Sequence, residues 1–242
     1  MSEENKRSIR ISVRNLVEFV LRSGDIDNRR SGNAQKDAML AGGRIHRKIQ
    51  KRMGSGYRAE VPLKHEVTDD EQEIVLSVEG RADGIFTENG ITVIDEIKGM
   101  YTDVARLEAP IEVHLAQAMC YGYFYCCDKD LDGIRLQLTY CNLETEEIRR
   151  FQTDRSKEEL EQWFSGVVHE YFKWARYLYH HELTRDASIR NLEFPYPYRE
   201  GQRDLVVSVY RTISRKKRLF IQAPTGIGKT LSTVFPAVRA SG

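Results

Sequence analysis

Two carboxylates and a lysine lie on either side of a sharp turn in the sequence. Asp83 precedes Asn89-Gly90, and Glu96 and Lys98 follow that dipeptide. Asn-Gly between two apolar-rich runs predicts a hairpin with a two-residue loop, because both loop positions need a positive φ. Such a loop places Asp83 opposite Glu96 on one face of the sheet, with Lys98 two residues further along on that face.

Two facing carboxylates repel each other and destabilise a hairpin unless something compensates. A divalent cation such as Mg²⁺ or Mn²⁺ would do so, since hard cations prefer oxygen ligands. Asp83 and Glu96 are therefore candidate ligands of a catalytic cation, and Lys98 would position the attacking water or neutralise the phosphate under attack. The alternative is a surface hairpin in which Lys98 is only the counter-charge. Strand alternation puts Asp95 on the opposite face, which favours Glu96 as the ligand.

Four short motifs, in this order, resemble those of a nuclease superfamily. Gly80-Arg-Ala-Asp83 and Val93-Ile-Asp-Glu-Ile-Lys98 are similar to the acidic and E-x-K motifs of PD-(D/E)XK nucleases. Gly42-Gly-Arg-Ile-His46 and Gln117-Ala-Met-Cys-Tyr121 resemble the G-x-x-x-H and Q-x-x-x-Y helix motifs of the RecB-like exonuclease branch. Each motif is weak alone, and the set in one order is more specific.

The resemblance implies an α/β fold with a PD-(D/E)XK, restriction-endonuclease-like core, in which helices flank a mixed central sheet. It also implies a metal-dependent DNase. His46 would be a further metal ligand beside Asp83 and Glu96, and Gln117 and Tyr121 would line the cleft and contact the DNA strand. Outside this context, a single helical histidine is more often a satisfied surface or core residue, and the polar and aromatic stripe could be a buried seam.

The helix expected from residue 34 to residue 53 carries a basic face beside His46. Its members are Arg44, Arg47, Lys48, Lys51 and Arg52. They are candidate DNA phosphate contacts, although a solvated helix face is an equal alternative. The net charge of only +1 means that any affinity for nucleic acid must come from local clusters such as this one.

Apolar periodicity and capping residues predict the elements that position these side chains. Ser12 predicts the N-cap of a helix that runs to Arg22 and stops at Gly24. Alternation predicts a meander of strands over residues 57–66, 74–88 and 91–98, a helix over 112–126, and strands over 134–141 and 148–151.

Ser156 and Glu159 form a capping box that opens a long helix. Its apolar residues are expected to face the core, namely Leu160, Trp163, Phe164, Val167, Tyr171, Trp174 and Leu178.

The composition, with 40 % hydrophobic and 30 % charged residues, excludes extensive disorder. No apolar run approaches a membrane span, and the first residues lack the apolar core of a secretory signal, so an intracellular protein, cytoplasmic or nucleoid-associated, with no membrane partner is expected. The cysteines show no C-x-x-C spacing. Some RecB-like relatives carry an iron–sulfur cluster on cysteines that flank the nuclease core, but none flanks it here, and no cluster is expected.

A second pattern begins after residue 190. Phe194-Pro-Tyr-Pro-Tyr198 predicts a stiff linker, and a short apolar strand is expected at Leu219–Ile221. Ala223-Pro-Thr-Gly-Ile-Gly-Lys-Thr230 then resembles a P-loop, whose backbone N–H groups cradle nucleotide phosphates. Lys229 would contact the β/γ-phosphates, and Thr230 would contact Mg²⁺.

The stretch from Phe194 to this loop resembles the opening of XPD/DinG-type DNA helicases, in which the glutamine reads adenine. The candidate nucleotide-binding residues are Gln202, Gly226, Gly228, Lys229 and Thr230. Ala223 stands where the strict P-loop motif has glycine, as is common in helicases. No acidic Walker B motif follows before Gly242, so ATP is expected as a cofactor only in a complete helicase domain.

The predicted organisation is a nuclease domain at 1–190, a linker at 191–198 and the N-terminal fragment of a P-loop helicase domain at 199–242. We expect an excised or naturally truncated part of a nuclease–helicase fusion that hydrolyses phosphodiester bonds of single-stranded DNA in DNA repair or processing. Its partners would be DNA and the remainder of the helicase domain. The alternatives are a catalytically silent DNA-binding clamp of the same fold and a nucleotide-binding helicase fragment.

Overall fold

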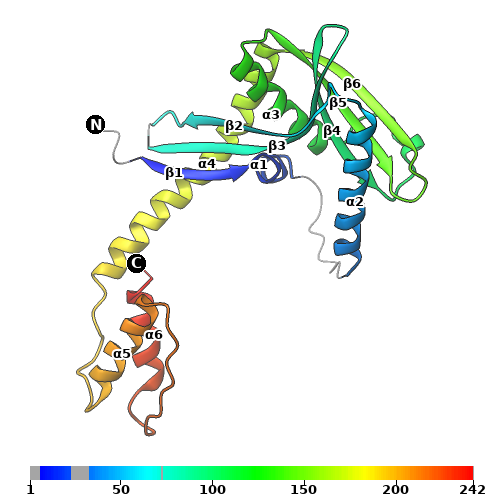
Figure 1. Ribbon diagram of the computed structural model, residues 1–242. Coiled ribbons are helices and arrows are strands. Elements are labelled where there is room, and N and C mark those ends of the chain that lie inside the picture. Colours follow the sequence, from blue (N-terminus) through cyan, green and yellow to red (C-terminus); the bar gives the residue numbers. More distant parts are fainter. Residues whose placement is uncertain (1–5, 23–32, 72, 242) are drawn as a thin grey trace. The chain divides into compact units, whose positions relative to one another are not determined.

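The computed structural model describes residues 6–22, 33–71 and 73–241. The chain divides into two compact units, Met1–Trp174 and Ala175–Gly242. The first unit is a mixed sheet with its helices, and the second is helical with irregular connections (Figure 1). The mixed α/β class expected from the sequence is confirmed. The domain limits at residues 190 and 198 stay predictions.

The sheet of the first unit is mixed because it contains both parallel and antiparallel pairs. Its strands are β1 (Arg7–Ser12), β2 (Arg58–Thr68), β3 (Ile74–Glu88), β4 (Ile91–Met100), β5 (Gly133–Asn142) and β6 (Ile148–Ser156). Strand β3 is parallel to β1 and antiparallel to β2 and β4, while β5 is parallel to β4 and antiparallel to β6. The sequence predicted the meander β2-β3-β4 but not β1.

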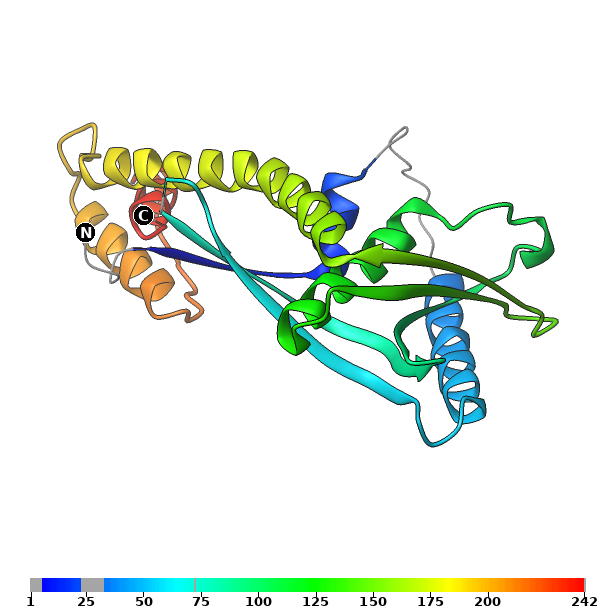
Figure 2. The same cartoon turned by 90° about the horizontal axis from the view of Figure 1, so that it is seen from above.

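Strand β3 has two different partners along one of its sides. It pairs with β1 over Ile74–Glu79 and with β4 over Gly84–Glu88. Strand β2 pairs with both stretches, so it must lie along the other side of β3. Figure 2 shows β2 and β3, both cyan, running side by side as a twisted pair. Residues 80–83 of β3 therefore lie in a gap between β1 and β4.

The hairpin register predicted from Asn89-Gly90 is confirmed. Both residues have positive φ, at 50° and 80°. Glu88 pairs with Ile91, and the ladder runs back to the pair Gly84 and Asp95. The next facing positions are those of Asp83 and Glu96.

Two helices cover opposite faces of β4. The described helices that begin in this unit are α1 (Val13–Val20), α2 (Asn33–Arg52), α3 (Glu112–Lys129), α4 (Lys157–Arg190) and the short 3-10 helix η2 (Val104–Arg106). Ile97 packs against Ile45 and Ile49 of α2, whereas the adjacent Lys98 bonds to Gln117 of α3. Since successive strand residues point to opposite faces, α2 and α3 lie on opposite sides of β4.

The capping predictions for two helices are confirmed. Ser12 accepts a hydrogen bond from the backbone N–H of Asn15 at the start of α1. Ser156 and Glu159 exchange the two hydrogen bonds of a capping box, at 3.2 and 3.0 Å. Helix α1 ends at Val20, before Arg22, and the predicted stop at Gly24 lies outside the described residues.

The prediction that the apolar residues of α4 all face the core is partly wrong. Leu160 and Phe164 are buried, but Trp174 is 45 % exposed and Leu178 is also exposed. The apolar residues recur every 3.5 positions, while an α-helix has 3.6 residues per turn, so the stripe drifts around the helix. Later in α4 the buried positions include those of Phe172 and Ala175.

The second unit contains the end of α4, helix α5 (Gln202–Ser214) and helix α6 (Lys229–Arg239). Arg239 donates to the carbonyl oxygens of Ile189 and Arg190 at 2.6 Å each, which caps the C-terminus of α4. The strand predicted at Leu219–Ile221 is wrong, because that stretch has no regular structure. Phe220 is 94 % exposed, and no other strand lies among the described residues of this unit to pair with it.

None of the helices formed by residues 6–22, 33–71 and 73–241 is long and apolar enough to cross a membrane.

Candidate active site at the β3–β4 fork

The candidate site lies where β4 separates from β3. Beyond the last pair, Gly84 and Asp95, the ladder stops, and the next two facing residues are Asp83 and Glu96. On the other side of β3 the β2 ladder also skips one pair, between Asp83 and Glu60. Glu60 has a φ of 54°, in the left-handed region that non-glycine residues rarely adopt. The backbone around Asp83 is thus released from both neighbouring strands.

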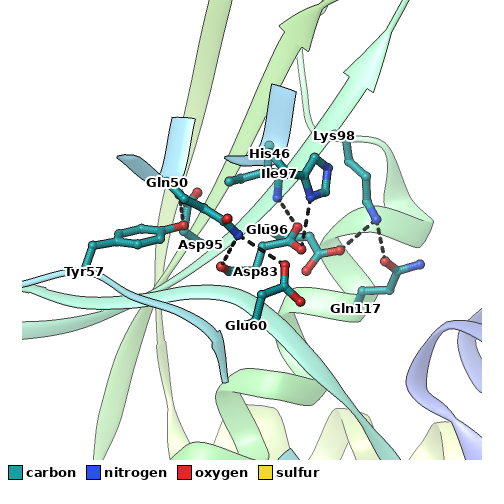
Figure 3. Close-up of polar contacts among 10 residues, drawn as sticks. All are labelled: His46, Gln50, Tyr57, Glu60, Asp83, Asp95, Glu96, Ile97, Lys98 and Gln117. Carbon is teal, nitrogen blue, oxygen red and sulfur yellow. Dashed lines mark hydrogen bonds and ion pairs between the residues drawn. The ribbon is translucent and has the colours of Figure 1, made fainter. Parts of the chain in front are cut away.

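Side chains take the place of the missing strand bonds around Asp83. Its carboxylate Oδ2 accepts a hydrogen bond of 2.7 Å from the backbone N–H of Ile97. Its backbone carbonyl accepts one of 3.0 Å from Gln50, whose amide also lies 3.3 Å from Glu60 Oε1. Figure 3 shows the carboxyl groups of Glu60, Asp83 and Glu96 turned toward a common space.

His46 reaches the site from α2. Its Nδ1 lies 3.3 Å from Asp83 Oδ1. Burial alone would lower the pKa of His46, but the hydrogen bond and negative charge of Asp83, with a further contribution from Glu96, raise it above its ordinary value. The structure therefore pairs the histidine with one of the two carboxylates.

Lys98 pairs with the other carboxylate. Its Nζ lies 2.7 Å from Glu96 Oε1 and donates to Gln117 Oε1 at 2.8 Å. Glu96 is 4 % exposed, and its Oε2 is buried with no hydrogen-bond partner among the described residues. Burial and the nearby charge of Asp83 raise the pKa of Glu96, and the charge of Lys98 only partly offsets them. An unpartnered buried carboxylate oxygen is costly, so this one favours a proton or a bound cation.

The donor set suits a divalent cation by chemistry but not in its present conformation. The two carboxylates are suitable ligands for Mg²⁺ or Mn²⁺, whereas an imidazole is a more usual ligand of transition metals than of Mg²⁺. However, the ligand atoms of His46, Asp83 and Glu96 do not all lie within 4.8 Å of one another. Since Mg²⁺ contacts its ligands at about 2.0 to 2.1 Å, these side chains would have to rotate before one cation could contact all three.

Asp95 faces away from this set, as strand alternation predicted. It is fully buried and accepts hydrogen bonds from Tyr57, Gln137 and Thr139, at 3.0, 3.0 and 2.6 Å. Burial raises the pKa of the Asp95 carboxyl, and the three donors partly oppose that shift. Gly84 lets Tyr57 pass, because a Cβ at position 84 would lie 1.8 Å from the tyrosine ring.

Gln117 and Tyr121 are both buried on α3. Gln117 holds Lys98, and Tyr121 hydrogen-bonds to the backbone of Arg81, inside the gap between β1 and β4. A Cβ on Gly80 would lie 2.6 Å from the Tyr121 hydroxyl oxygen, so the tyrosine fills this gap closely. Their contact with DNA stays a prediction, while both residues support the sheet.

The basic face of α2 is exposed. Lys48 and Arg52 share Glu146 as an acidic partner, Lys48 through a short ion pair and Arg52 at 4.0 Å. Arg44, Arg47 and Lys51 have no acidic partner among the described residues. Three cations are thus free to meet a phosphate backbone, and their role stays a prediction.

The residues of the P-loop motif lie together in the second unit. Gly226 and Gly228 have φ of 93° and 80°. Lys229 Nζ, at the start of α6, donates to the carbonyl oxygens of Ala223 and Pro224 at 3.0 Å each. Gln202 packs against the loop, since a Cβ on Gly228 would lie 2.6 Å from its Nε2. Thr230 is exposed one residue after Lys229.

Sequence reasoning missed four residues that support the site, namely Gln50, Tyr57, Gln137 and Thr139. Gln50 lies four positions after His46 and therefore on the same face of α2, so helical periodicity could have found it. Gln137 and Thr139 share one face of β5, which is a weaker signal. Nothing in the sequence around Tyr57 points to Asp95.

No known family profile matches the chain. A stretch of 47 residues, 19 % of the chain, is 45 % identical to the probable ATP-dependent helicase MJ0942 of Methanocaldococcus jannaschii, and it covers 7 % of that protein. The chain thus spans a small part of this relative.

Among solved structures, the crystal structure of SSO0001 is 18 % identical with a TM-score of 0.43, covering 69 % of this chain and 77 % of the other. The alkaline exonuclease LHK-Exo of Laribacter hongkongensis is 12 % identical with a TM-score of 0.43, covering 72 % and 94 %. At TM-scores below 0.5, neither similarity carries an argument about function.

Proposed function

We propose that the first unit is a metal-dependent nuclease that hydrolyses phosphodiester bonds in DNA. The observation that carries this proposal is the pair of facing carboxylates, Asp83 and Glu96, at a point where the ladder stops and Lys98 joins them. A structural hairpin gains nothing from two adjacent acids, one of them buried with an unpartnered oxygen.

Each residue of the fork has a role in this chemistry. Asp83 and Glu96, with His46 after rotation, would hold Mg²⁺ or Mn²⁺, which would supply Lewis-acid stabilisation of the charge on a phosphate under attack. Lys98 is kept in place by Glu96 and Gln117, where its ammonium orients water or balances negative charge. The exposed cations of α2 would hold the phosphate backbone.

A cleavage assay tests the proposal. End-labelled linear, end-blocked and circular single-stranded DNA are incubated with Mg²⁺ or Mn²⁺, and products are resolved by length. We expect metal-dependent cleavage that is lost in Glu96→Gln and Lys98→Ala, while Lys64→Ala, an exposed lysine of β2, is the matched control. Full activity in either site variant would falsify the assignment, and DNA binding without any cleavage would favour a silent clamp.

The second unit supports a further proposal. We infer that residues 199–242 belong to a nucleotide-binding helicase domain, and that the nuclease acts on single strands that such a motor supplies during DNA repair or processing. The glycine loop at Lys229 supports this, as does the similarity of 47 residues to a probable ATP-dependent helicase. The exposed apolar stretch Leu219–Ile221 would become a strand when further strands of that domain are present.

Nucleotide hydrolysis separates the two proposals. We expect no ATP hydrolysis by the present chain, because no Walker B acid follows the loop, while its nuclease activity is independent of ATP. ATP hydrolysis that disappears in Lys229→Ala would instead show a motor within this chain. A nuclease activity lost in Lys229→Ala would contradict the separation of the two sites.

A further inference from the structure

The last pair of the β3–β4 ladder lies directly beside the two candidate catalytic acids. Gly84 pairs with Asp95, and one residue further along each strand are Asp83 and Glu96. From there on no strand bond fixes the separation of β3 and β4, apart from the side-chain bond of Asp83 to Ile97. The spacing of the acids therefore depends on how firmly this last pair is held.

One buried carboxylate ties several segments together at this point. Asp95 accepts from Thr139 and Gln137 of β5, and Gln137 is held in turn by Gln152 of β6 at 2.8 Å. Tyr57, which precedes β2, donates to the other oxygen of Asp95 at 3.0 Å. The segments on both sides of the fork are thus joined through a single side chain.

Tyr57 reaches Asp95 only because of its neighbours. Its ring crosses Gly84, where a Cβ would lie 1.8 Å away, and it stacks on Phe86 with ring centres 5.7 Å apart. The space at Gly84 and the stacked ring of Phe86 hold the Tyr57 ring where its hydroxyl group meets Asp95. A buried acid with several donors is rarely better for stability than apolar residues of the same volume, so a geometric role is the more economical explanation.

We propose that Asp95 and Tyr57 are positioning residues, whose hydrogen bond fixes the point where β3 and β4 separate and so sets the spacing of Asp83 and Glu96. This inference rests on the proposed nuclease function. Asp95 is fully buried on the face opposite Glu96, so it does not touch substrate or cation, and Tyr57 acts through its bond to Asp95. Both act through the backbone of their neighbours.

The test uses Tyr57→Phe, which removes one hydroxyl group and keeps the stacked ring. The matched control is Tyr125→Phe, which removes a part-buried hydroxyl that is bonded to Arg58 at 2.5 Å and not to Asp95. Three quantities are measured on the full chain: the melting temperature, the Kd for Mn²⁺ alone by electron paramagnetic resonance, and kcat and KM for cleavage of single-stranded DNA.

For Tyr57→Phe we expect Mn²⁺ affinity and kcat to fall by about 10- to 100-fold with little change in KM, since this is the usual effect of losing a group that orients metal ligands. Tyr125→Phe should lower the melting temperature about as much as Tyr57→Phe does, and it should leave Mn²⁺ affinity, kcat and KM unchanged. Asp95→Asn should lower Mn²⁺ affinity and kcat as Tyr57→Phe does. The double variant should lose no more of either than Asp95→Asn alone, because both changes break the same hydrogen bond between Tyr57 and Asp95.

Each outcome has a distinct meaning. Wild-type protein that neither binds Mn²⁺ nor cleaves DNA contradicts the proposed function itself. Active wild-type protein with unchanged Mn²⁺ affinity and kcat in Tyr57→Phe overturns the positioning role alone. If Tyr57→Phe does not fold, the same measurements on Asp95→Asn decide, and equal effects in Tyr125→Phe would reduce the role to general stability.

Discussion

The carboxylate of Asp83 lies 2.7 Å from the backbone nitrogen of Ile97, and this single side-chain bond replaces the strand pairing that ends one residue earlier. Asp83 thus has a structural bond on one oxygen and faces His46 with the other. Its two roles can be separated by mutation, because amide and methyl replacements remove different properties.

Asp83→Asn should abolish metal-dependent cleavage and leave stability nearly unchanged, since the amide oxygen can still accept from Ile97. Asp83→Ala should abolish cleavage and also lower the free energy of unfolding by about 1 to 3 kcal/mol, because it leaves a buried N–H unsatisfied. Urea denaturation of both variants measures the difference. Equal stability of the two variants would show that the bond to Ile97 is unimportant.

Gly84 is expected to be intolerant of any side chain. A Cβ there would lie 1.8 Å from the Tyr57 ring, far inside contact distance, so Gly84→Ala should lower the free energy of unfolding by about 1 to 3 kcal/mol. The loss should shrink when Tyr57→Ala is added, because the clashing ring is gone. If the effects of Gly84→Ala and Tyr57→Ala on the free energy of unfolding simply add, the strain does not arise from a clash between these two residues.

The position of the acids in the hairpin could be predicted because it depends on local rules. Asn89-Gly90 fixes the turn, the turn fixes the register, and the register places Asp83 opposite Glu96. The gap in β3 could not be predicted, because it arises from the long-range pairing of β1 with Ile74–Glu79. A strand of six residues before a helix cap carries too little periodicity to reveal a parallel partner.

The supporting bonds were equally hidden from sequence. Asp95 was correctly placed on the opposite face, but its donors come from residues 38 to 44 positions away and depend on the tertiary fold. The segment Leu219–Ile221 shows the opposite error, because its composition favours a strand while its surroundings offer no partner. Local patterns thus located the candidate reacting groups, and the fold determined which residues hold them.

Glu60 is expected to cost stability where it stands. Its φ of 54° is unfavourable for any residue with a Cβ, so Glu60→Gly should raise the free energy of unfolding by about 0.5 to 1 kcal/mol. Glu66 is an exposed acid in the same strand without a positive φ, and Glu66→Gly should lower the free energy of unfolding by a similar amount. Denaturant titration of both variants measures these opposite signs. Destabilisation in both would mean that Glu60 is not strained.

His114 predicts a loss of stability in mild acid. It lies 3.3 Å from the Tyr140 hydroxyl, and burial together with the charges of Lys98 and Arg14 lowers its pKa from 6.5 to about 4, against a smaller opposing effect of Glu18. The folded state therefore binds fewer protons than the unfolded state between these two values. Stability from the neutral imidazole is complete above pH 6.5 and is lost as the pH falls toward 4.

The expected loss is about 1 to 2 kcal/mol, less than the full pKa shift implies, because the imidazole is partly exposed and solvent screens the nearby charges. His114→Gln has no titrating group at this position, so its stability should change less between pH 7 and pH 5 than that of the wild type. Urea denaturation of both proteins across this range separates the effect of His114 from that of the other titrating groups, Glu96 and His46 among them, because both proteins share those groups. Parallel stability curves for the two proteins would mean that His114 is protonated equally in the folded and unfolded states. That result would contradict the lowered pKa expected from its position against Tyr140, the residue that pairs with Lys98.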